Sequence, residues 1–232
     1  NSPAFVATWI AAVRLGAWIV PSDPMSRTQE LVEHLSRTGA RIGVCSVHRR
    51  DEYRASAGAM PVLEVDEDDC ALEAFGQVQH ADWPAVGPRD RAAVMFTSGT
   101  TGRPKGVVVT QANYSFAGQV MAAAAELREE HRQLVVLPLF HANAQYYSFA
   151  SAIAVGASVA LVHAFSASRF LGQAKRHGAT HASLFAAPIR MILARGATPV
   201  PGLALQHCWY AMNLADGQYE EFASLVGCRP RQ

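Results

Sequence analysis

This 232-residue sequence has almost no net charge, no paired cysteines and no long apolar run. Lys and Arg total 20 and Asp and Glu 19, so we expect no strongly basic surface for nucleic acid phosphates. The four cysteines, Cys45, Cys70, Cys208 and Cys228, are far apart and form no C-x-x-C pair. This spacing argues against a disulfide framework or a zinc site and for reduced thiols. The balanced charge and the unpaired cysteines favour a cytoplasmic protein that does not bind nucleic acid.

The most apolar segment near the start runs from Pro3 to Val13 and is followed by Arg14. It is well short of the roughly 20 residues that a membrane span needs. It also lacks the basic start and the small-residue cleavage site of a signal peptide. Ser2 as N-cap, Pro3 in the first turn and Gly16 past the end instead predict a buried helix. Because the sequence starts at this cap without a Met, we expect it to be a piece of a longer chain.

Half of the residues are hydrophobic, enough for a substantial buried core. Ser26 and Gly39 are placed to cap and end a second helix. The elements expected in the first half are helices over residues 3–13 and 27–37 and strands over residues 17–22, 41–46 and 61–65.

Four acidic residues, Asp66, Glu67, Asp68 and Asp69, follow the last of these strands. Adjacent carboxylates resemble a metal site, but such a run is more typical of a solvated loop. Residues 76–91 contain prolines, glycines and mixed polar residues and have the composition of a connector.

The second half alternates apolar runs with amphipathic segments. Its expected strands cover residues 92–96, 106–110, 133–139, 158–164, 181–185 and 204–211, and its expected helices cover residues 111–127, 144–155, 168–177, 188–194 and 215–226. This alternation predicts an α/β protein with layered, mostly parallel β-sheets flanked by helices, and one architecture shared by both halves.

The segment FTSGTTGRPKG, from Phe96 to Gly106, is too polar and too rich in glycine for the interior of a helix or strand. Its glycines let the backbone turn and present N–H groups to an anion, and Lys105 adds a mobile positive charge. The spacing fits neither the Walker loop nor the dinucleotide pattern G-x-G-x-x-G. From its residues alone, the segment is either a polyphosphate-binding loop or a solvated hairpin.

As a whole, TSGTTGRPKG (97–106) resembles the phosphate-loop signature of the adenylate-forming superfamily, which contains acyl-CoA synthetases, nonribosomal peptide adenylation domains and firefly luciferase. Residues 1–24 resemble an early helix and strand of the large N-terminal domain in that superfamily. LPLFHANAQ (137–145) resembles a motif of its carboxylate pocket, and CRPRQ (228–232) the segment before its Tyr-Gly-x-Thr-Glu motif. The resemblance implies that residues 1–232 are part of this N-terminal AMP-binding domain, without the early family segment and the C-terminal lid domain.

Enzymes of this superfamily join a carboxylate to the α-phosphate of ATP, release pyrophosphate, and in many cases transfer the acyl group to coenzyme A. The resemblance therefore implies ATP, Mg²⁺ and coenzyme A as cofactors and a small carboxylic acid as substrate. It places His141 where the carboxylate and the α-phosphate meet. The residues that it assigns to the β- and γ-phosphates are Thr97, Ser98, Gly99, Thr100, Thr101, Gly102 and Lys105.

The histidine after Pro-x-Phe resembles acyl-CoA and aryl-CoA ligases more than amino-acid adenylation domains. HANAQYYSF and WYAMNLADGQYEEF are similar to crotonobetaine/carnitine-CoA ligases, whereas residues 210–213 differ from the Gly-Gly-Ala at the adenine site of other branches. His177 and His181 are four residues apart, as in a helical metal pair. Gly178 and Thr180 between them favour a helix end and a strand start, so we assign no metal ligand.

Two other functions stay open: an adenylation domain that loads a carrier protein, and a non-catalytic nucleotide-binding or assembly fragment. The superfamily's metal-facing glutamate, ribose-binding aspartate and catalytic lysine have no counterpart in these 232 residues. We therefore expect the isolated chain to be inactive, and to self-associate or pair with the remainder of the domain. The sequence does not identify the acid, because small differences in a pocket control specificity.

Overall fold

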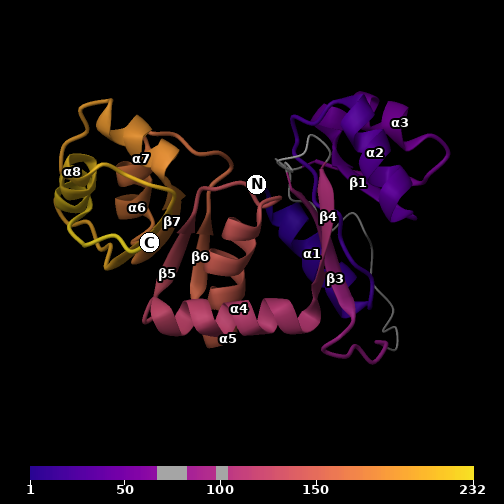
Figure 1. The fold of residues 1–232 in the computed structure, drawn as a ribbon, viewed down its shortest axis with the longest axis horizontal. Helices are drawn as coiled ribbons and strands as arrows, with labels where there is room; N and C mark the ends of the chain where they lie inside the picture. Colours follow the sequence, from indigo (N-terminus) through magenta and orange to yellow (C-terminus); the bar gives the residue numbers. More distant parts are fainter. Residues whose placement is uncertain (67–82, 98–103) are drawn as a thin grey trace. The chain divides into compact units, whose positions relative to one another are not determined.

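The computed structural model describes residues 1–66, 83–97 and 104–232. The acidic residues 67–69, the first part of the predicted connector and residues 98–103 of the predicted phosphate loop lie outside this description. The chain divides into two compact units, residues 2–112 and residue 1 with residues 113–232, which are described separately (Figure 1). No helix within the described ranges is long and apolar enough to cross a membrane.

The first unit begins with helix α1 (Pro3–Arg14), whose predicted caps are confirmed. The side-chain oxygen of Ser2 accepts the backbone N–H of Phe5 at 3.2 Å, which satisfies one of the free donors at the helix start. Leu15 is the C-cap, and Gly16 follows in the left-handed conformation with a φ of 71°.

Helix α2 (Thr28–Thr38) is capped differently from the prediction. Its N-cap is Arg27 instead of Ser26, and the carboxylate of Glu30 accepts the backbone N–H of Arg27 at 2.9 Å. The glutamate in the first turn thus satisfies the donor at the helix start, so the helix begins one residue later than we predicted. Gly39 ends the helix, as predicted.

Strands β1 (Gly43–Ser46) and β2 (Val62–Val65) form a parallel pair, which confirms two predicted strands. The 3₁₀ turn η1 (Val47–Arg49) and helix α3 (Arg50–Ala57) connect them. We did not predict α3, because its sequence RDEYRASA has few apolar residues at helical spacing.

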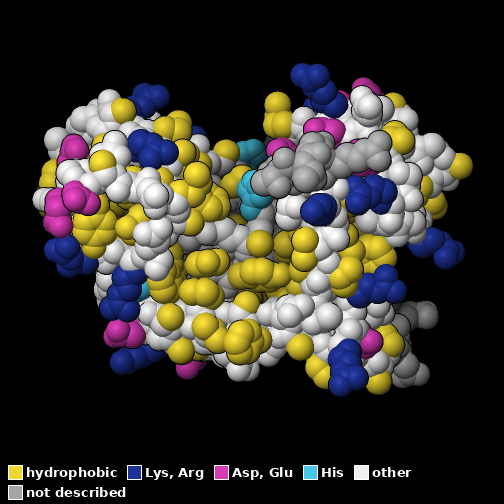
Figure 2. Space-filling view, in the orientation of Figure 1, with side chains coloured by type: hydrophobic (Ala, Val, Ile, Leu, Met, Phe, Trp, Pro, Cys, Tyr) yellow, Lys and Arg dark blue, Asp and Glu magenta, His cyan; other side chains and the backbone are white. Residues whose placement is uncertain are grey.

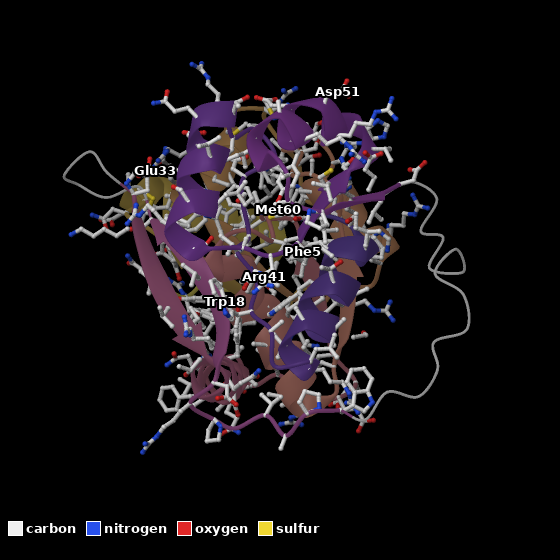
Figure 3. All side chains as sticks on the ribbon, turned by 90° about the vertical axis from the view of Figure 1, so that its right-hand side faces the viewer. Phe5, Trp18, Glu33, Arg41, Asp51 and Met60 are labelled. Carbon is white, nitrogen blue, oxygen red and sulfur yellow. The ribbon has the colours of Figure 1, made fainter. Side chains whose placement is uncertain are left out.

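Helices α2 and α3 present charged side chains at the surface of this unit. Figure 3 shows Glu33 of α2 and Asp51 of α3 at its periphery, and the Asp51 side chain is 96% exposed. On its other side, α3 is joined to β2 by an ion pair between Arg54 and Glu64. The helix also contacts α2 and strand β1, so this ion pair is one of several contacts that hold it.

Strands β3 (Arg91–Thr97) and β4 (Lys105–Thr110) pair in the antiparallel direction, which confirms two predicted strands. On the other side of β3, the N–H of Ile19 donates to the carbonyl of Ala92 at 3.1 Å, and the N–H of Val94 donates to the carbonyl of Ile19 at 2.8 Å. The predicted strand at residues 17–22 is thus reduced to a single bridge.

The second unit is built on a four-stranded parallel sheet with the order β6-β5-β7-β8. Its strands are β5 (Arg132–Val135), β6 (Ser158–Leu161), β7 (His181–Phe185) and β8 (His207–Ala211). The parallel α/β prediction is confirmed here. The described part of the first unit has two-stranded sheets instead, so the two halves do not share one sheet plan.

The core of the second unit lies around the two central strands. Leu134 of β5 and Leu184 of β7 have no exposed surface, and each buried side chain of this kind contributes about 1.5–3 kcal/mol. The helices around the sheet add further fully buried residues: Phe170, Ile189, Ile192 and Phe222.

The helices of this unit are α4 (Gln111–Ala124), which begins at the end of the first unit, the π-helix η3 (Ala144–Ala150), α5 (Ser151–Val155), α6 (Phe170–Arg176), α7 (Ala186–Leu193) and α8 (Asp216–Val226). The connection from β5 to β6 runs across the sheet in one direction, and those from β6 to β7 and from β7 to β8 run in the other. Because such crossovers are right-handed, η3 and α5 cover one face and α6 and α7 the opposite face (Figure 1).

The boundary between β5 and β7 is therefore a topological switch point. Open α/β sheets bind ligands beside such a point, at the carboxyl ends of the strands. The turn that contains His141 leaves the carboxyl end of β5 at this boundary.

Candidate functional site

The β3–β4 hairpin brings the two ends of the predicted phosphate loop together. Thr97 is the register partner of Lys105, and both are exposed. The hydroxyl of Thr97 donates to the carbonyl of Lys105 at 3.5 Å. The other predicted phosphate-binding residues, Ser98, Gly99, Thr100, Thr101 and Gly102, lie outside the described residues.

Helix α2 holds the base of this hairpin. The ring of His34 stacks on Phe96 of β3, with centroids 3.9 Å apart and planes at 13°. The Arg37 guanidinium lies 5.3 Å from the same ring and donates a hydrogen bond to the carbonyl of Pro104. Burial lowers the pKa of His34, so the stacked ring favours its neutral form. Sequence reasoning missed these contacts, because no local pattern links α2 to a hairpin so far along the chain.

The last glycine of the loop signature has a packing role. Gly106 faces Phe96 across the hairpin. A Cβ at this position would lie 3.0 Å from Cγ1 of Val94 and 3.5 Å from Cε1 of Phe96. The missing side chain therefore makes room mainly for the Val94 side chain, beside the Phe96 ring.

The second part of the site is the turn between β5 and η3, which we call the His141 turn (Leu137–His141). His141 is exposed, and its ring centroid lies 4.1 Å from that of Phe140. The backbone N–H of His141 donates to the carbonyl of Pro138 at 3.1 Å, which closes the turn. The predicted site residue thus presents its imidazole at the carboxyl end of a central strand.

The side chain of Asn1 forms hydrogen bonds with the start of this turn. Its Nδ2 donates to the carbonyls of Leu137 and Val162, both at 3.0 Å. Its Oδ1 accepts the backbone N–H of Leu139 at 2.8 Å. One amide therefore satisfies polar groups on the His141 turn and after β6, a role that no local sequence signal indicates.

Two buried amides follow the turn, both within the motif LPLFHANAQ. Asn143 accepts a hydrogen bond from the hydroxyl of Ser183 on β7 at 2.9 Å, which ties the segment across the switch point. Gln145 donates from Nε2 to the carbonyl of Leu139 at 2.6 Å and accepts from the hydroxyl of Tyr114 on α4. The motif contained both residues, but the sequence singled out only His141.

The segment after β8 differs in sequence from a Gly-Gly-Ala adenine site, yet one of its residues has a backbone conformation that glycine favours. Met212 has a φ of 73°, in the left-handed region that favours glycine, and its side chain is 63% exposed. The carbonyl of Asn213 accepts a hydrogen bond from Arg190 at 3.2 Å.

The histidine pair of the sequence has the predicted local structure. His177 is the C-cap of α6 and His181 starts β7. The ring of His181 lies between those of His131 and His207, with centroid distances of 4.8 and 5.8 Å. Burial lowers the pKa of His207 to about 4. These rings lie at the amino ends of the strands, away from the carboxyl-end site.

Among the residues that the structure describes, no group of three or more His, Cys, Asp or Glu side chains could hold a metal ion. The thiols of Cys45, Cys208 and Cys228 are free, whereas Cys70 lies outside the description. Burial raises the pKa of the Cys208 thiol, which keeps it protonated and unreactive.

Residues 1–230 match the family model described as AMP-binding enzyme. The crotonobetaine/carnitine–CoA ligase of Salmonella arizonae is 30% identical to this chain over an alignment of 246 positions. The alignment covers 99% of this chain and 47% of that protein. The chain thus spans about half the length of the curated relatives it matches. ATP-bound MatB from Rhodopseudomonas palustris aligns with a TM-score of 0.87 at 19% identity, covering 99% of this chain and 47% of MatB. The o-succinylbenzoate CoA synthetase of Bacillus subtilis, in complex with its acyl-adenylate intermediate, aligns with a TM-score of 0.80 at 24% identity, covering 95% and 56%. These structural similarities confirm the predicted fold class.

Proposed function

This chain belongs to the AMP-binding enzyme family, and on this basis we propose that its parent protein activates a small carboxylic acid with ATP and transfers the acyl group to coenzyme A. The observation that carries the proposal is the register pairing of Thr97 with Lys105, which brings the two ends of the segment TSGTTGRPKG together. A loop of this composition suits a polyphosphate. The names of the relatives, which are CoA ligases, support the acyl acceptor.

In the first step, the carboxylate oxygen attacks the α-phosphorus of ATP, and pyrophosphate leaves. In the second step, the thiol of coenzyme A attacks the acyl carbon, and AMP leaves. We assign the β- and γ-phosphates to the charge of Lys105 and to the hydroxyl and backbone donors of Thr97, Ser98, Gly99, Thr100, Thr101 and Gly102. Charge-assisted donors placed before the reaction stabilise the leaving pyrophosphate without reorganisation.

We assign His141 to the point where the carboxylate and the α-phosphate meet. Two features of the second unit support this role: the exposed imidazole and the position of the His141 turn at the switch point. An imidazole N–H there would orient the carboxylate for in-line attack, which lowers the barrier through positioning.

The described residues hold no group of three or more His, Cys, Asp or Glu side chains that could bind a metal ion, and Mg²⁺ commonly binds through substrate phosphates with only one or two carboxylates. We therefore take it to arrive as the magnesium complex of ATP, and we assign none of these residues to it. When bound to the triphosphate, the ion neutralises part of the phosphate charge.

Two alternatives compete with this proposal. A domain that loads a carrier protein would carry out the first step but make no thioester with free coenzyme A. A nucleotide-binding or assembly fragment would bind ATP without turnover. The CoA ligase names of the relatives favour free coenzyme A over a carrier protein.

The test uses the full-length parent protein with ATP, Mg²⁺, coenzyme A and a panel of short and medium carboxylic acids. We expect acid-dependent pyrophosphate exchange and an acyl-CoA product detected by mass spectrometry. Exchange without acyl-CoA would identify a carrier-protein loader, and ATP binding without exchange would identify a binding fragment. Either result would reject the acyl-CoA ligase.

The same assay on residues 1–232 alone should give no acyl-CoA, because the chain spans about half the length of its curated relatives. We propose that this isolated chain self-associates. Val107 and Val108 of the edge strand β4 are 49% and 52% exposed, and Phe116 and Val120 of α4 are 69% and 45% exposed. Figure 2 shows hydrophobic side chains at the surface over α4. Size-exclusion chromatography that shows only monomer at high concentration would contradict this proposal.

A further inference from the structure

The shape of the His141 turn depends on one buried amide. The side chain of Gln145 has no exposed surface and reaches back from η3 to the carbonyl of Leu139, two residues before His141. The carbonyl can only accept, so the group at 2.6 Å from it must be the amide N–H₂. The amide oxygen therefore points the other way, toward Tyr114.

Tyr114 completes the bridge from helix α4. Its hydroxyl faces the amide oxygen of Gln145, which accepts only, so the hydroxyl donates. Burial raises the pKa of Tyr114 well above its ordinary value, so this donor keeps its proton at physiological pH. The chain of contacts from the α4 hydroxyl to the Leu139 carbonyl thus has one consistent direction.

The backbone of Gln145 also contacts the His141 turn. Its N–H lies 3.4 Å from the carbonyl of His141. Its side chain and its backbone therefore contact residues on both sides of Phe140, and a shift of the amide would move the whole turn.

We infer that Gln145 is the positioning residue for His141, because its amide, oriented by Tyr114, sets the backbone from which the His141 imidazole projects. This inference rests on the proposed function only where it concerns catalysis. A glutamine is required chemically, because a buried side chain here must donate at one end and accept at the other. A glutamate loses the donor, and a methionine loses both contacts.

Three variants of the full-length protein separate the two ends of the bridge. Gln145→Met removes both contacts at similar volume. Gln145→Glu keeps an acceptor for Tyr114 but, while ionised, cannot donate to Leu139. Tyr114→Phe removes only the hydroxyl. The matched control is Gln119→Met, a change at an exposed glutamine of α4.

The first measurement follows the His141 imidazole by NMR and does not depend on any activity. The His141 signal is assigned from its loss in His141→Gln. We expect its chemical shift and titration midpoint to move in Gln145→Met and Gln145→Glu, to move less in Tyr114→Phe, and to match wild type in Gln119→Met. Unchanged His141 signals in a folded Gln145→Met would overturn the inference, whatever happens to stability.

The second measurement is pyrophosphate exchange at varied acid and ATP concentrations. We expect kcat/KM for the acid to fall roughly tenfold to hundredfold in Gln145→Met, because small displacements of a positioning group have effects of this size. We expect KM for ATP to stay within about twofold of wild type, since the phosphate contacts are elsewhere. A rise in KM for ATP of tenfold or more would overturn a role specific to His141.

The third measurement is the pH dependence of Gln145→Glu. Burial raises the pKa of a carboxyl group, and a protonated glutamate regains a donor for Leu139. The loss of kcat/KM in this variant should therefore shrink as the pH falls from about 8 to 6, whereas that of Gln145→Met should stay constant.

Should wild type show no exchange with any acid, the proposed function fails, and the NMR result still decides the positioning role. If Gln145→Met does not fold, Tyr114→Phe decides it.

Discussion

Replacing Gly118 by alanine tests how closely α4 approaches the π-helix that follows the His141 turn. Gly118 is buried and lies one helical turn after Tyr114. A Cβ built at this position would lie 2.5 Å from the carbonyl oxygen of Ala150 and 2.8 Å from its carbonyl carbon. These atoms are helical backbone at the end of η3, so no side-chain rotation can relieve the contact.

Two opposing effects set the magnitude. Alanine in place of glycine in a helix gains about 1 kcal/mol from propensity. Overpacking a well-packed contact costs about 1–3 kcal/mol. Because the clash is with backbone, we expect the cost to lie at the upper end of this range. The net result is a loss of about 1–2 kcal/mol in the free energy of unfolding, against the direction that helix propensity alone predicts.

The matched control is Gly172→Ala in α6, where a Cβ would meet no atom within 4 Å. This variant should gain about 0.5–1 kcal/mol. Urea unfolding of both variants and wild type, followed by circular dichroism, gives the two free energies. If Gly118→Ala is stabilised as much as Gly172→Ala, the close approach of α4 to η3 is wrong. The link from α4 through Tyr114 to the His141 turn would then lose its support.

Three further changes probe other parts of the chain. Lys105→Ala in the parent protein should slow pyrophosphate exchange roughly tenfold to hundredfold, because a charge-assisted contact is worth ~1.5–3 kcal/mol; wild-type kinetics would refute its phosphate role. His207 has a folded pKa of about 4, below its ordinary value, so the unfolded chain binds the extra proton, and stability should fall by on the order of 2 kcal/mol as the pH drops from about 6.5 to 4. His207→Gln should flatten this slope in urea titrations and exposed His163→Gln should not, and equal slopes would contradict the assignment. Met212→Gly should leave the unfolding free energy unchanged or raise it by up to about 1 kcal/mol, since it relieves a left-handed residue. Exposed Met191→Gly within α7 should lower it by about 1 kcal/mol, and a larger loss in Met212→Gly than in Met191→Gly would contradict the strain.

The sequence by itself determined the features that depend on neighbouring residues. Ser2 and Gly16 mark the ends of α1, because capping uses groups within four residues. The alternation of apolar runs with amphipathic segments determined the α/β class, since burial on both faces of a parallel sheet needs such strands. TSGTTGRPKG indicated the family, because the glycines, hydroxyls and lysine of its signature are consecutive in the sequence.

Element ends were less predictable, because pairing partners decide them. The apolar run at residues 133–139 predicted a strand of that length, but β5 ends at Val135, and residues 137–139 belong to the His141 turn. The run stays apolar because Leu137 and Leu139 are buried in the turn. Hydrophobicity reports burial and does not distinguish a buried strand from a buried turn.

Only the tertiary structure decided which residues hold the candidate site. Asn1 and Leu139 are 138 positions apart, Arg37 and Pro104 are 67 apart, and Tyr114 and Gln145 are 31 apart. Likewise, Asn143 meets Ser183 only because β7 lies beside β5 in the sheet. A buried polar group must find a partner, but its own sequence neighbours do not show which one, because the order of the strands and the packing of the helices bring that partner into reach.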